Sequence, residues 1–295
     1  MAKIAVIGLS GQSIFMKVNN LPTPSTTIHS TNLYIEPGGK GYNQAVACKK
    51  LGAEVSYFSK VGCDEYGNIC EKYLKDLGIK TIFEKDKILN TALATILTDD
   101  LAENEVIVYK GASSNLNVSE LKDFESEIAT ADVLLLQYEI SIDVVKKAIE
   151  IAKENNTLVI LNPAPAIYLD KEILNMADIV TPNYEEAKTL YGLDIEKLPS
   201  SINNTLIVTL GSKGSLLINN HTSKKFSPIN VEAVDTTGAG DIFNAGLAVA
   251  IANKKSIEEA IEFATVASGL SVTKEHVMDS IPTKEMVEEY LKRHK

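Results

Sequence analysis

The chain has 295 residues, of which 45% are hydrophobic, so it can bury the core of one large α/β domain or of two small ones. Its formal net charge of −10 argues against nucleic acid or an anionic membrane surface as the main partner, because both bind basic surfaces. The three cysteines lack metal-ligand spacing, and the first predicted strand begins at Lys3 with no space for a signal peptide, so we expect a cytoplasmic protein without a membrane-spanning helix.

The N-terminal residues predict a strand that is buried on both faces. Residues 3–8 form a continuous apolar run that ends in glycine. Ligands bind at the carboxyl edge of an open α/β sheet, so residues 10–13, which follow this strand, are expected close to a ligand. Residues 28–36 predict a strand of a small sheet outside the main one.

A glycine-rich segment, residues 38–45, opens a predicted helix that runs to about Leu51. The segment is not a P-loop, because Lys40 is not followed by Ser or Thr at the required spacing. Its residues alone fit a flexible loop with a surface lysine as well as they fit a ligand site.

The middle of the chain alternates between predicted strands and helices. Two strands at 92–98 and 105–109 are expected to be joined by an acidic turn over 99–104. The alternation predicts a doubly wound, mostly parallel sheet with helices on both faces. The other strands of this region are expected at 55–61, 133–137 and 157–162, and its helices at 68–77, from 119, and at 142–155.

Two polar residues stand three apart where a strand from 179 gives way to a helix. Asn183 and Glu186 supply oxygen ligands that suit Mg²⁺, directly or through water. The alternative is a capping box, in which the same two side chains satisfy helix amides, and the spacing alone favours it. Residues 205–210 and 215–218 then predict two strands around a glycine turn.

Residues 234–246 carry the most informative pattern. Gly238 and Gly240 permit unusual backbone angles just before a buried helix that runs to about Ala252. A glycine-rich turn that feeds the unpaired first amides of a helix predicts an anion site, most often for phosphate. Asp241 at its mouth is placed to accept a proton during phosphoryl transfer. The alternative is an ordinary turn in which Asp241 only caps the helix. Two more helices, 256–270 and 283–293, are expected after it.

Two segments resemble one enzyme family. Residues 235–246 read Asp-Thr-Thr-Gly-Ala-Gly-Asp-x-Phe-x-Ala-Gly, which closely resembles the C-terminal signature of the ribokinase-like (PfkB) carbohydrate kinases. Residues 38–43 match the Gly-Gly-Lys-Gly-x-Asn segment that meets the sugar in that family. The resemblance covers essentially the whole chain in order. It implies a single ribokinase-like α/β domain over 1–295, with a β-sheet lid from about 12–36 and 88–110.

The resemblance implies an ATP-dependent transfer of the γ-phosphoryl group to a hydroxyl of a small sugar. Asp241 would be the base, and the amides of Gly238, Ala239 and Gly240 would form an anion hole. Mg²⁺ would be held through water by Asn183 and Glu186. The sugar contacts implied are Gly38, Gly39, Lys40, Asn43, Glu139 and Asp241, and the nucleotide contacts are Asn183, Thr209, Gly211, Gly214 and Gly240. From the residues alone, Glu139 fits an N-cap of the next helix equally well.

Two places depart from the family pattern. Many sugar kinases of the family carry Asn-x-Asp after the first strand, and Gly11 and Ser13 stand there in this chain. Loss of a charged acceptor typically costs ~1.5–3 kcal/mol of binding, so D-ribose is a weaker expectation, and Gln12 or Ser13 is expected to contact a different sugar, a nucleoside or a sugar phosphate. His276 stands where glycine is usual in the monovalent-cation loop. The expected K⁺ ligands, mostly through main-chain carbonyls, are Asp235, Thr237, Ser271 and Ser280.

Other functions remain open on the sequence. A nucleoside kinase would use the same Asp241 with an aromatic-lined pocket, for which Phe15, Tyr34 and Tyr42 are candidates. A non-catalytic ligand-binding protein would not need the intact segment 238–241. A hydride-transferring Rossmann enzyme is disfavoured, because no Gly-x-Gly-x-x-Gly helix follows the first strand. The lid of many family members also forms a dimer contact, so a homodimer through the lid is expected.

Overall fold

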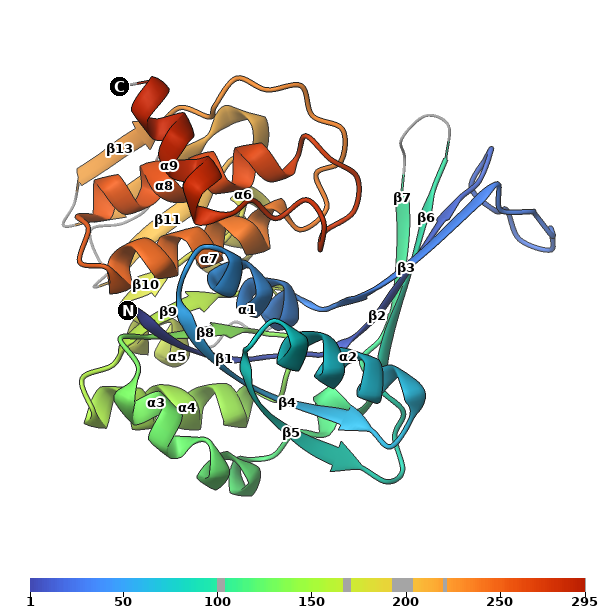
Figure 1. Ribbon diagram of the computed structural model, residues 1–295, viewed down its shortest axis with the longest axis horizontal. Helices are drawn as coiled ribbons and strands as arrows, with labels where there is room; N and C mark the ends of the chain where they lie inside the picture. The colour runs from blue at the N-terminus through green and yellow to red at the C-terminus, as the bar shows by residue number, and fades with distance from the viewer. Residues whose placement is uncertain (100–103, 167–170, 193–203, 220–221, 295) are drawn as a thin grey trace.

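The computed structural model describes residues 1–99, 104–166, 171–192, 204–219 and 222–294. A nine-stranded sheet and a separate four-stranded sheet organise it, as Figure 1 shows. The strand order in the large sheet is β13-β12-β11-β10-β9-β8-β1-β4-β5. Its strands are β1 Lys3–Ile7, β4 Glu54–Gly62, β5 Lys80–Asp86, β8 Val133–Gln137, β9 Leu158–Asn162, β10 Ile179–Val180, β11 Thr205–Thr209, β12 Ser215–Asn219 and β13 Thr222–Phe226.

The pairs from β11 across to β5 are parallel, and only the β12 and β13 edge is antiparallel. Strands β1, β8 and β9 are almost entirely apolar and buried, because helices cover both faces. The turn after β11 contains the short 3₁₀ helix η4, Gly211–Lys213. Within the described part of the chain, no helix has both the length and the apolar content that crossing a membrane requires.

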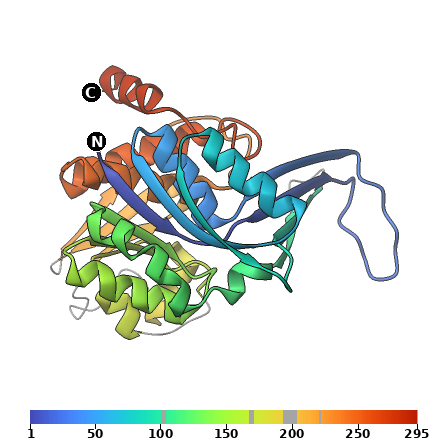
Figure 2. The same ribbon diagram turned by 60° about the horizontal axis from the view of Figure 1, so that its bottom comes forward.

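Helices sandwich the large sheet in two layers, which Figure 2 shows above and below it. Alternate residues of β1 point to opposite cores: Ile4 and Val6 pack with one layer of helices, and Ala5 and Ile7 with the other. The first layer holds α1 Lys40–Lys50, α2 Glu65–Asp76, α7 Ala239–Ala252, α8 Ile257–Ser271 and α9 Lys284–Arg293. The second holds η2 Val118–Asp123, α3 Glu125–Thr130, α4 Ile142–Glu154, α5 Lys171–Met176 and α6 Tyr184–Tyr191.

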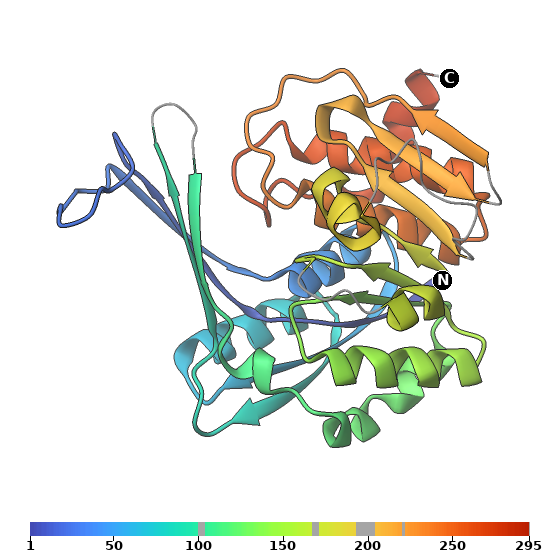
Figure 3. The ribbon, with the colours of Figure 1, turned by 180° about the vertical axis from the view of Figure 1, so that it is seen from behind.

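The small sheet projects from the body as a lid, seen from opposite sides in Figures 1 and 3. Its strand order is β3-β2-β6-β7, with bounds β2 Gly11–Lys17, β3 Asn32–Gly38, β6 Ala92–Thr98 and β7 Asn104–Tyr109. β2 begins only four residues after β1 ends, and β3 leads directly into α1. The lid therefore rises from the carboxyl edge of the large sheet, beside the N-terminus of α1.

The expected doubly wound sheet with a small lid sheet is confirmed. The boundaries differ in several places. The lid strand expected at 28–36 spans Asn32–Gly38, and the helix expected from Ser119 is the 3₁₀ helix η2 followed by the short α3. Sequence patterns missed α5 and the edge strands β5 and β13, because edge strands such as β13 carry mostly polar residues. Residues 100–103 of the expected acidic turn lie outside the described residues.

Candidate active site

A buried carboxylate lies where the N-termini of α1 and α7 meet. Asp241, in the first turn of α7, is only 7% exposed. Its Oδ2 accepts a hydrogen bond from Asn43 Nδ2 at 2.9 Å, and its Oδ1 accepts one from Gln44 Nε2 at 3.0 Å. Burial raises the pKa of Asp241, while the Lys40 charge and these two hydrogen bonds oppose the rise. Both oxygens are thus held in place by side chains of α1.

The amide that orients Asp241 is itself oriented from the sheet. Gln137, at the end of β8, donates from Nε2 to Gln44 Oε1 at 2.6 Å. Both glutamines are fully buried. Because Gln44 Oε1 accepts this bond, its amide nitrogen faces Asp241. Neither glutamine was predicted as a site residue, because both roles depend on contacts between segments that are distant in sequence.

The charge of Lys40 interacts with three carboxylates, one of which is Asp241. Lys40 opens α1, and its backbone N–H donates to Glu139 Oε2 at 2.8 Å. Burial lowers the pKa of the Lys40 ammonium, but the charges of Asp241, Glu139 and Glu186 outweigh burial and raise it. Lys40 is therefore a fixed positive charge at this point. Glu139 is not the N-cap of α4, a position held by Ser141.

The glycines before α1 leave no space for side chains. A Cβ on Gly38 would lie 2.5 Å from Ser13 Oγ, and one on Gly39, whose φ is 114°, would strike the Leu9 carbonyl. Asn43 Oδ1 would lie 3.9 Å from the same Cβ on Gly38, and it has no hydrogen-bond partner among the described residues. Ser13, Gly38 and Asn43 therefore line one small polar region beside Asp241.

Gln12 is not part of this region. Side chains alternate along a strand, so Gln12 points to the opposite face of β2 from Ser13. There its Nε2 lies 3.5 Å from Cys70 Sγ of α2, and the residue is 2% exposed. The expected contact of Gln12 with a ligand is not supported by this placement.

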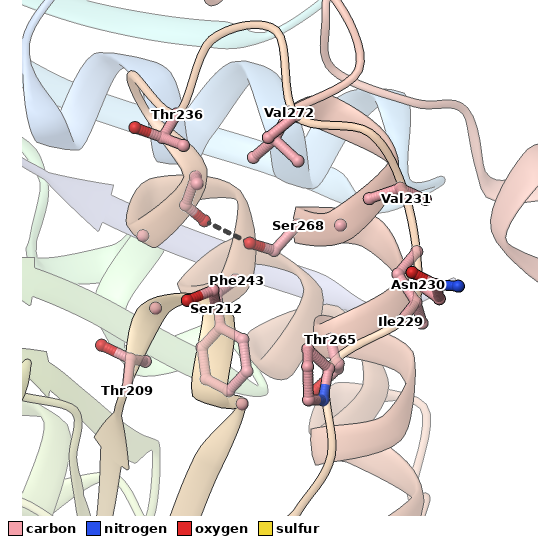
Figure 4. Close-up of a pocket in the computed structure, with 17 residues that line it drawn as sticks. Thr209, Ser212, Ile229, Asn230, Val231, Thr236, Phe243, Thr265, Ser268 and Val272 are labelled. Atoms are coloured by element: carbon pink, nitrogen blue, oxygen red, sulfur yellow. Dashed lines mark hydrogen bonds between the residues drawn. The ribbon is translucent and has the colours of Figure 1, made fainter.

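A cavity of about 540 Å³ lies on the other side of the α7 N-terminus, shown in Figure 4. This volume is in the range that holds a small-molecule ligand. Gly240, at its wall, has open space where a Cβ would stand. Ser268 Oγ donates to the carbonyl of Ala239 at 2.9 Å and so fixes the start of α7 against α8. Of the predicted nucleotide contacts, the lining includes Thr209, Gly211, Gly214 and Gly240, but not Asn183.

The amides of the predicted anion hole differ from one another. Gly238 has a φ of 74°, and a Cβ there would come within 2.8 Å of Val277. The N–H of Ala239 donates to the Thr236 carbonyl at 3.2 Å. No hydrogen bond joins the N–H of Gly240 to another residue in the described ranges. The same holds for the N–H of Gly238, so within the described residues these two amides, and not that of Ala239, are available to an anion.

Asn183 and Glu186 form a reciprocal capping box at the start of α6. Asn183 Oδ1 accepts the Glu186 N–H at 2.9 Å, and Glu186 Oε2 accepts the Asn183 N–H at 2.8 Å. Glu186 is also electrostatically coupled to Lys40 and Asp241. The pair therefore caps a helix whose N-terminus faces the Asp241 cluster. In the part of the chain that is described, no three His, Cys, Asp or Glu side chains gather as a metal site.

The predicted potassium ligands lie on two adjoining segments. The N–H groups of Val234 and Asp235 both donate to the Val272 carbonyl. Asp235 Oδ1 accepts the Thr237 N–H at 2.8 Å, and Oδ2 accepts the His276 N–H at 2.9 Å. The Ser271 and Ser280 hydroxyls donate to the carbonyls of Ser268 and Val277 respectively. These side chains are engaged within the protein, which leaves main-chain carbonyls as the groups available to a cation.

The aromatic residues considered for a base pocket are already packed. Tyr42 is fully buried and donates from its hydroxyl to the Cys70 carbonyl at 2.9 Å. Tyr34 of the lid stacks on His276, with ring centroids 3.7 Å apart, and Phe15 packs against the same imidazole at 5.1 Å. These contacts join the lid to the loop before α9 instead of forming a free aromatic wall.

Comparison with known proteins agrees with this architecture. The family model described as pfkB family carbohydrate kinase matches residues 1–284. A ribokinase from Haemophilus influenzae is 36% identical over 98% of each chain, and a deoxyribokinase from Salmonella typhi is 31% identical over 98% of each. The solved ribokinase structure from Thermotoga maritima has 36% identity and a TM-score of 0.89, covering 99% of this chain and 100% of its own.

A second solved structure is the Arabidopsis thaliana ribokinase complexed with ribose and ATP. It shares 28% identity with this chain, covers 99% of both chains and has a TM-score of 0.88. The match of the family model over almost the full length, together with these relatives, decides the assignment. The chain belongs to the pfkB family of carbohydrate kinases.

Proposed function

We propose that the protein transfers the γ-phosphoryl group of ATP to a hydroxyl of a small sugar, with Asp241 as the base. The observation that carries the proposal is the position of Asp241 between two sites. Its neighbour Gly240 lines the 540 Å³ cavity, while the carboxylate of Asp241 faces Asn43 on the lid side. A donor in the cavity and an acceptor beneath the lid would therefore meet at this carboxylate.

The chemistry follows from the groups at this junction. Asp241 accepts the proton of the acceptor hydroxyl while the oxygen of that hydroxyl forms a bond to the γ-phosphorus. The bond from that phosphorus to the β-γ bridging oxygen breaks, and ADP leaves with the electron pair. The Lys40 ammonium and the Gly240 amide stabilise the negative charge of the moving phosphoryl group.

Magnesium fits the donor side of this site. The Glu186 carboxylate faces the Lys40 and Asp241 charges while it caps α6 with Asn183. These two residues would hold Mg²⁺ through water, and the ion would neutralise charge on the ATP oxygens when bound. The cavity walls near Ile229, Val231 and Val272 supply apolar surface for the base of the nucleotide.

The acceptor is proposed to be a sugar rather than a nucleoside. Phe15 and Tyr34 are packed against His276, and Tyr42 is buried in the core, so none is free to stack on a base. The Arabidopsis relative was solved with ribose and ATP, which supports a sugar of similar size. Ser13 of the lid strand β2 and Asn43 of α1 are polar groups that would contact it.

The direct test is ADP release with Mg-ATP across pentoses, hexoses, hexose phosphates and nucleosides. We expect one class of sugar to stimulate ADP release strongly over the rate without acceptor. ADP release that only nucleosides stimulate would show that the acceptor is a nucleoside and not a sugar. Nucleotide binding without stimulation by any acceptor would contradict the proposed transfer.

A further inference from the structure

One lysine of the acceptor side has no role in the proposed transfer. Lys110 follows β7 by one residue and immediately precedes the 3₁₀ helix η1, Gly111–Asn115. It is partly buried, and it forms no ion pair with any residue that the structure describes. A partly buried ammonium without a paired anion is costly, so its surroundings suggest a ligand.

The lid fold fixes where Lys110 lies. Ser113 of η1 accepts the N–H of Ser10 at 3.2 Å, and Ala112 N–H donates to the Asn90 carbonyl at 2.8 Å. Ser10 stands between β1 and β2, at the carboxyl edge of the large sheet. The start of η1 is therefore held against the connection between β1 and β2, at the base of the lid.

Strand register places Val108, two residues before Lys110, on the same lid face as Ser13. Ser13 pairs with Ala94 of β6, and Ala94 pairs with Val108 of β7. Lys110 is the first residue after β7, where the backbone turns into η1, so it lies at the body end of the strand that carries Val108. Neighbouring strands are about 4.8 Å apart, so roughly 10 Å separates β2 from β7. Ala94 between them carries only a methyl group and leaves this part of the lid shallow.

The electrostatic surroundings agree with this placement. The charge of Lys110 acts on the Glu139 carboxyl, whose pKa is raised by burial and lowered by Lys40 and, more weakly, by Lys110. Glu139 already accepts the Lys40 N–H. Asn43 is 8% exposed, and its Oδ1, beside Asp241, has no hydrogen-bond partner within the described part of the chain. Among the described residues, the acceptor region thus has a cation without an ion pair near Glu139 and a hydrogen-bond acceptor without a partner beside Asp241.

We propose that the acceptor is a sugar acid, whose carboxylate binds Lys110 and Ser13 while a distant hydroxyl meets Asn43 and Asp241. This inference rests on the proposed kinase function and names its substrate class. The Ser13 hydroxyl can donate to a carboxylate, whereas an acidic residue at this position would repel one. Lys110 is the single cation of this part of the described lid face, which suits a monoanion better than a phosphate dianion.

The test compares the neutral sugar, the sugar acid and the sugar phosphate of the same two carbon skeletons. ADP release would be measured for D-ribose, D-ribonate and D-ribose 5-phosphate, and for D-glucose, D-gluconate and D-glucose 6-phosphate. We expect kcat/KM for an acid to exceed that for its neutral sugar by roughly tenfold or more, as charge-assisted hydrogen bonds allow. Preference for the phosphate over the acid would overturn the carboxylate assignment.

Variants separate Lys110 from general effects of charge. In Lys110→Met the ratio of kcat/KM for acid to that for neutral sugar should fall by roughly tenfold or more, mainly through KM. Lys110→Arg should retain most of the ratio. Lys17→Met, on the same lid face but near its exposed tip, is the matched control and should leave the ratio unchanged.

The outcomes also distinguish this inference from the proposed function. Strong phosphorylation of neutral sugars with the same ratio in wild type and Lys110→Met would overturn the role of Lys110 and leave the kinase intact. No ADP release with any acceptor would contradict the kinase function itself. In that case, binding of D-ribonate and D-gluconate to wild type and Lys110→Met by calorimetry without nucleotide still tests the subsite, and equal affinities would refute it.

Discussion

At the scale of single residues, the surroundings of Asp241, the proposed base, set its ionisation. Burial raises its pKa, and Lys40 together with the Asn43 and Gln44 amides counters that rise. A base with a raised pKa is protonated over a wider acidic range than an exposed aspartate. As the pH falls, activity should therefore be lost at a higher pH than it would be with a base of ordinary carboxyl pKa.

The contribution of Lys40 to that ionisation can be measured. Lys40→Met removes the charge that favours the ionised carboxylate, so the pKa of Asp241 should rise further. The acid limb of the kcat/KM profile, recorded from about pH 4 to pH 9, should move to higher pH in the variant. The height of the profile will also fall, because Lys40 is proposed to contact the phosphoryl group, so the position of the limb is the readout. An acid limb at the same pH in the variant and the wild type would show that the Lys40 charge does not affect the pKa of the catalytic base.

The sequence predicted some of these residues and not others. The motifs at 38–43 and 235–246 indicated Lys40, Asn43 and Asp241, and the structure brings all three together. Gln44 and Gln137 were missed, because their roles depend on contacts between α1, β8 and α7 that are distant in sequence. Gln12, which was expected beside the ligand, lies next to Cys70 of α2, because one step along a strand reverses the face to which a side chain points.

At the scale of elements, the N-terminus of α7 carries two glycines with different duties. Gly238 adopts a left-handed φ of 74° against Val277, whereas Gly240 has open space toward the cavity. One glycine is required by the backbone, and the other keeps a ligand surface clear. The sequence motif contains both but does not tell them apart.

Paired substitutions should separate these duties. Gly238→Ala should lower the free energy of unfolding by about 1–2 kcal/mol or more, because an alanine resists this φ and would meet Val277. Gly240→Ala should fold with nearly unchanged thermal stability but bind ATP less tightly, because its methyl group enters the cavity. Thermal melts and nucleotide titrations of both variants are the measurements. Equal loss of stability in the two would contradict the distinction.

The connection between lid and body is also an element-scale feature that the sequence did not reveal. Glu36 of β3, only 4% exposed, accepts the N–H groups of Val277 and Met278, each at 2.9 Å. Val277 in turn packs against Gly238. The lid is therefore tied to the segment that supports the proposed anion hole. The contact joins residues about 240 positions apart, which no local pattern encodes.

At the scale of the whole molecule, the lid presents apolar side chains to solvent. Leu33 is 57% exposed, Ile35 46% and Ile107 68%, and strand register places them together on the face opposite Ser13. Contiguous exposed apolar surface of this kind marks interaction sites.

We expect this lid face to support a homodimer. Light scattering after size exclusion should give twice the mass of one chain for the wild type. The double variant Ile35→Lys with Ile107→Lys should shift the protein to the monomer, because two charges would be buried in the contact. Val118→Lys, an exposed apolar position on the body, is the control. A wild type that stays monomeric at all accessible concentrations would refute the lid dimer.

Potassium activation is a further expectation that belongs to the assembled fold. The segments around Asp235 and Val272 are held together by main-chain hydrogen bonds close to the α7 N-terminus. A cation bound there through main-chain carbonyls would stabilise the anion hole, so rates should be several-fold higher in K⁺ than in choline at equal ionic strength. Identical rates in Na⁺, K⁺ and choline buffers would show that no monovalent cation activates the enzyme.

The central claim is that Asp241 is the base in phosphoryl transfer. The most direct measurement is kcat for Asp241→Asn with the best acceptor found, together with ATP affinity by titration. The loss of a positioned base should lower kcat by roughly 10²–10⁴-fold while ATP affinity changes little. A variant that binds ATP normally and retains the wild-type kcat would show that another group takes the proton.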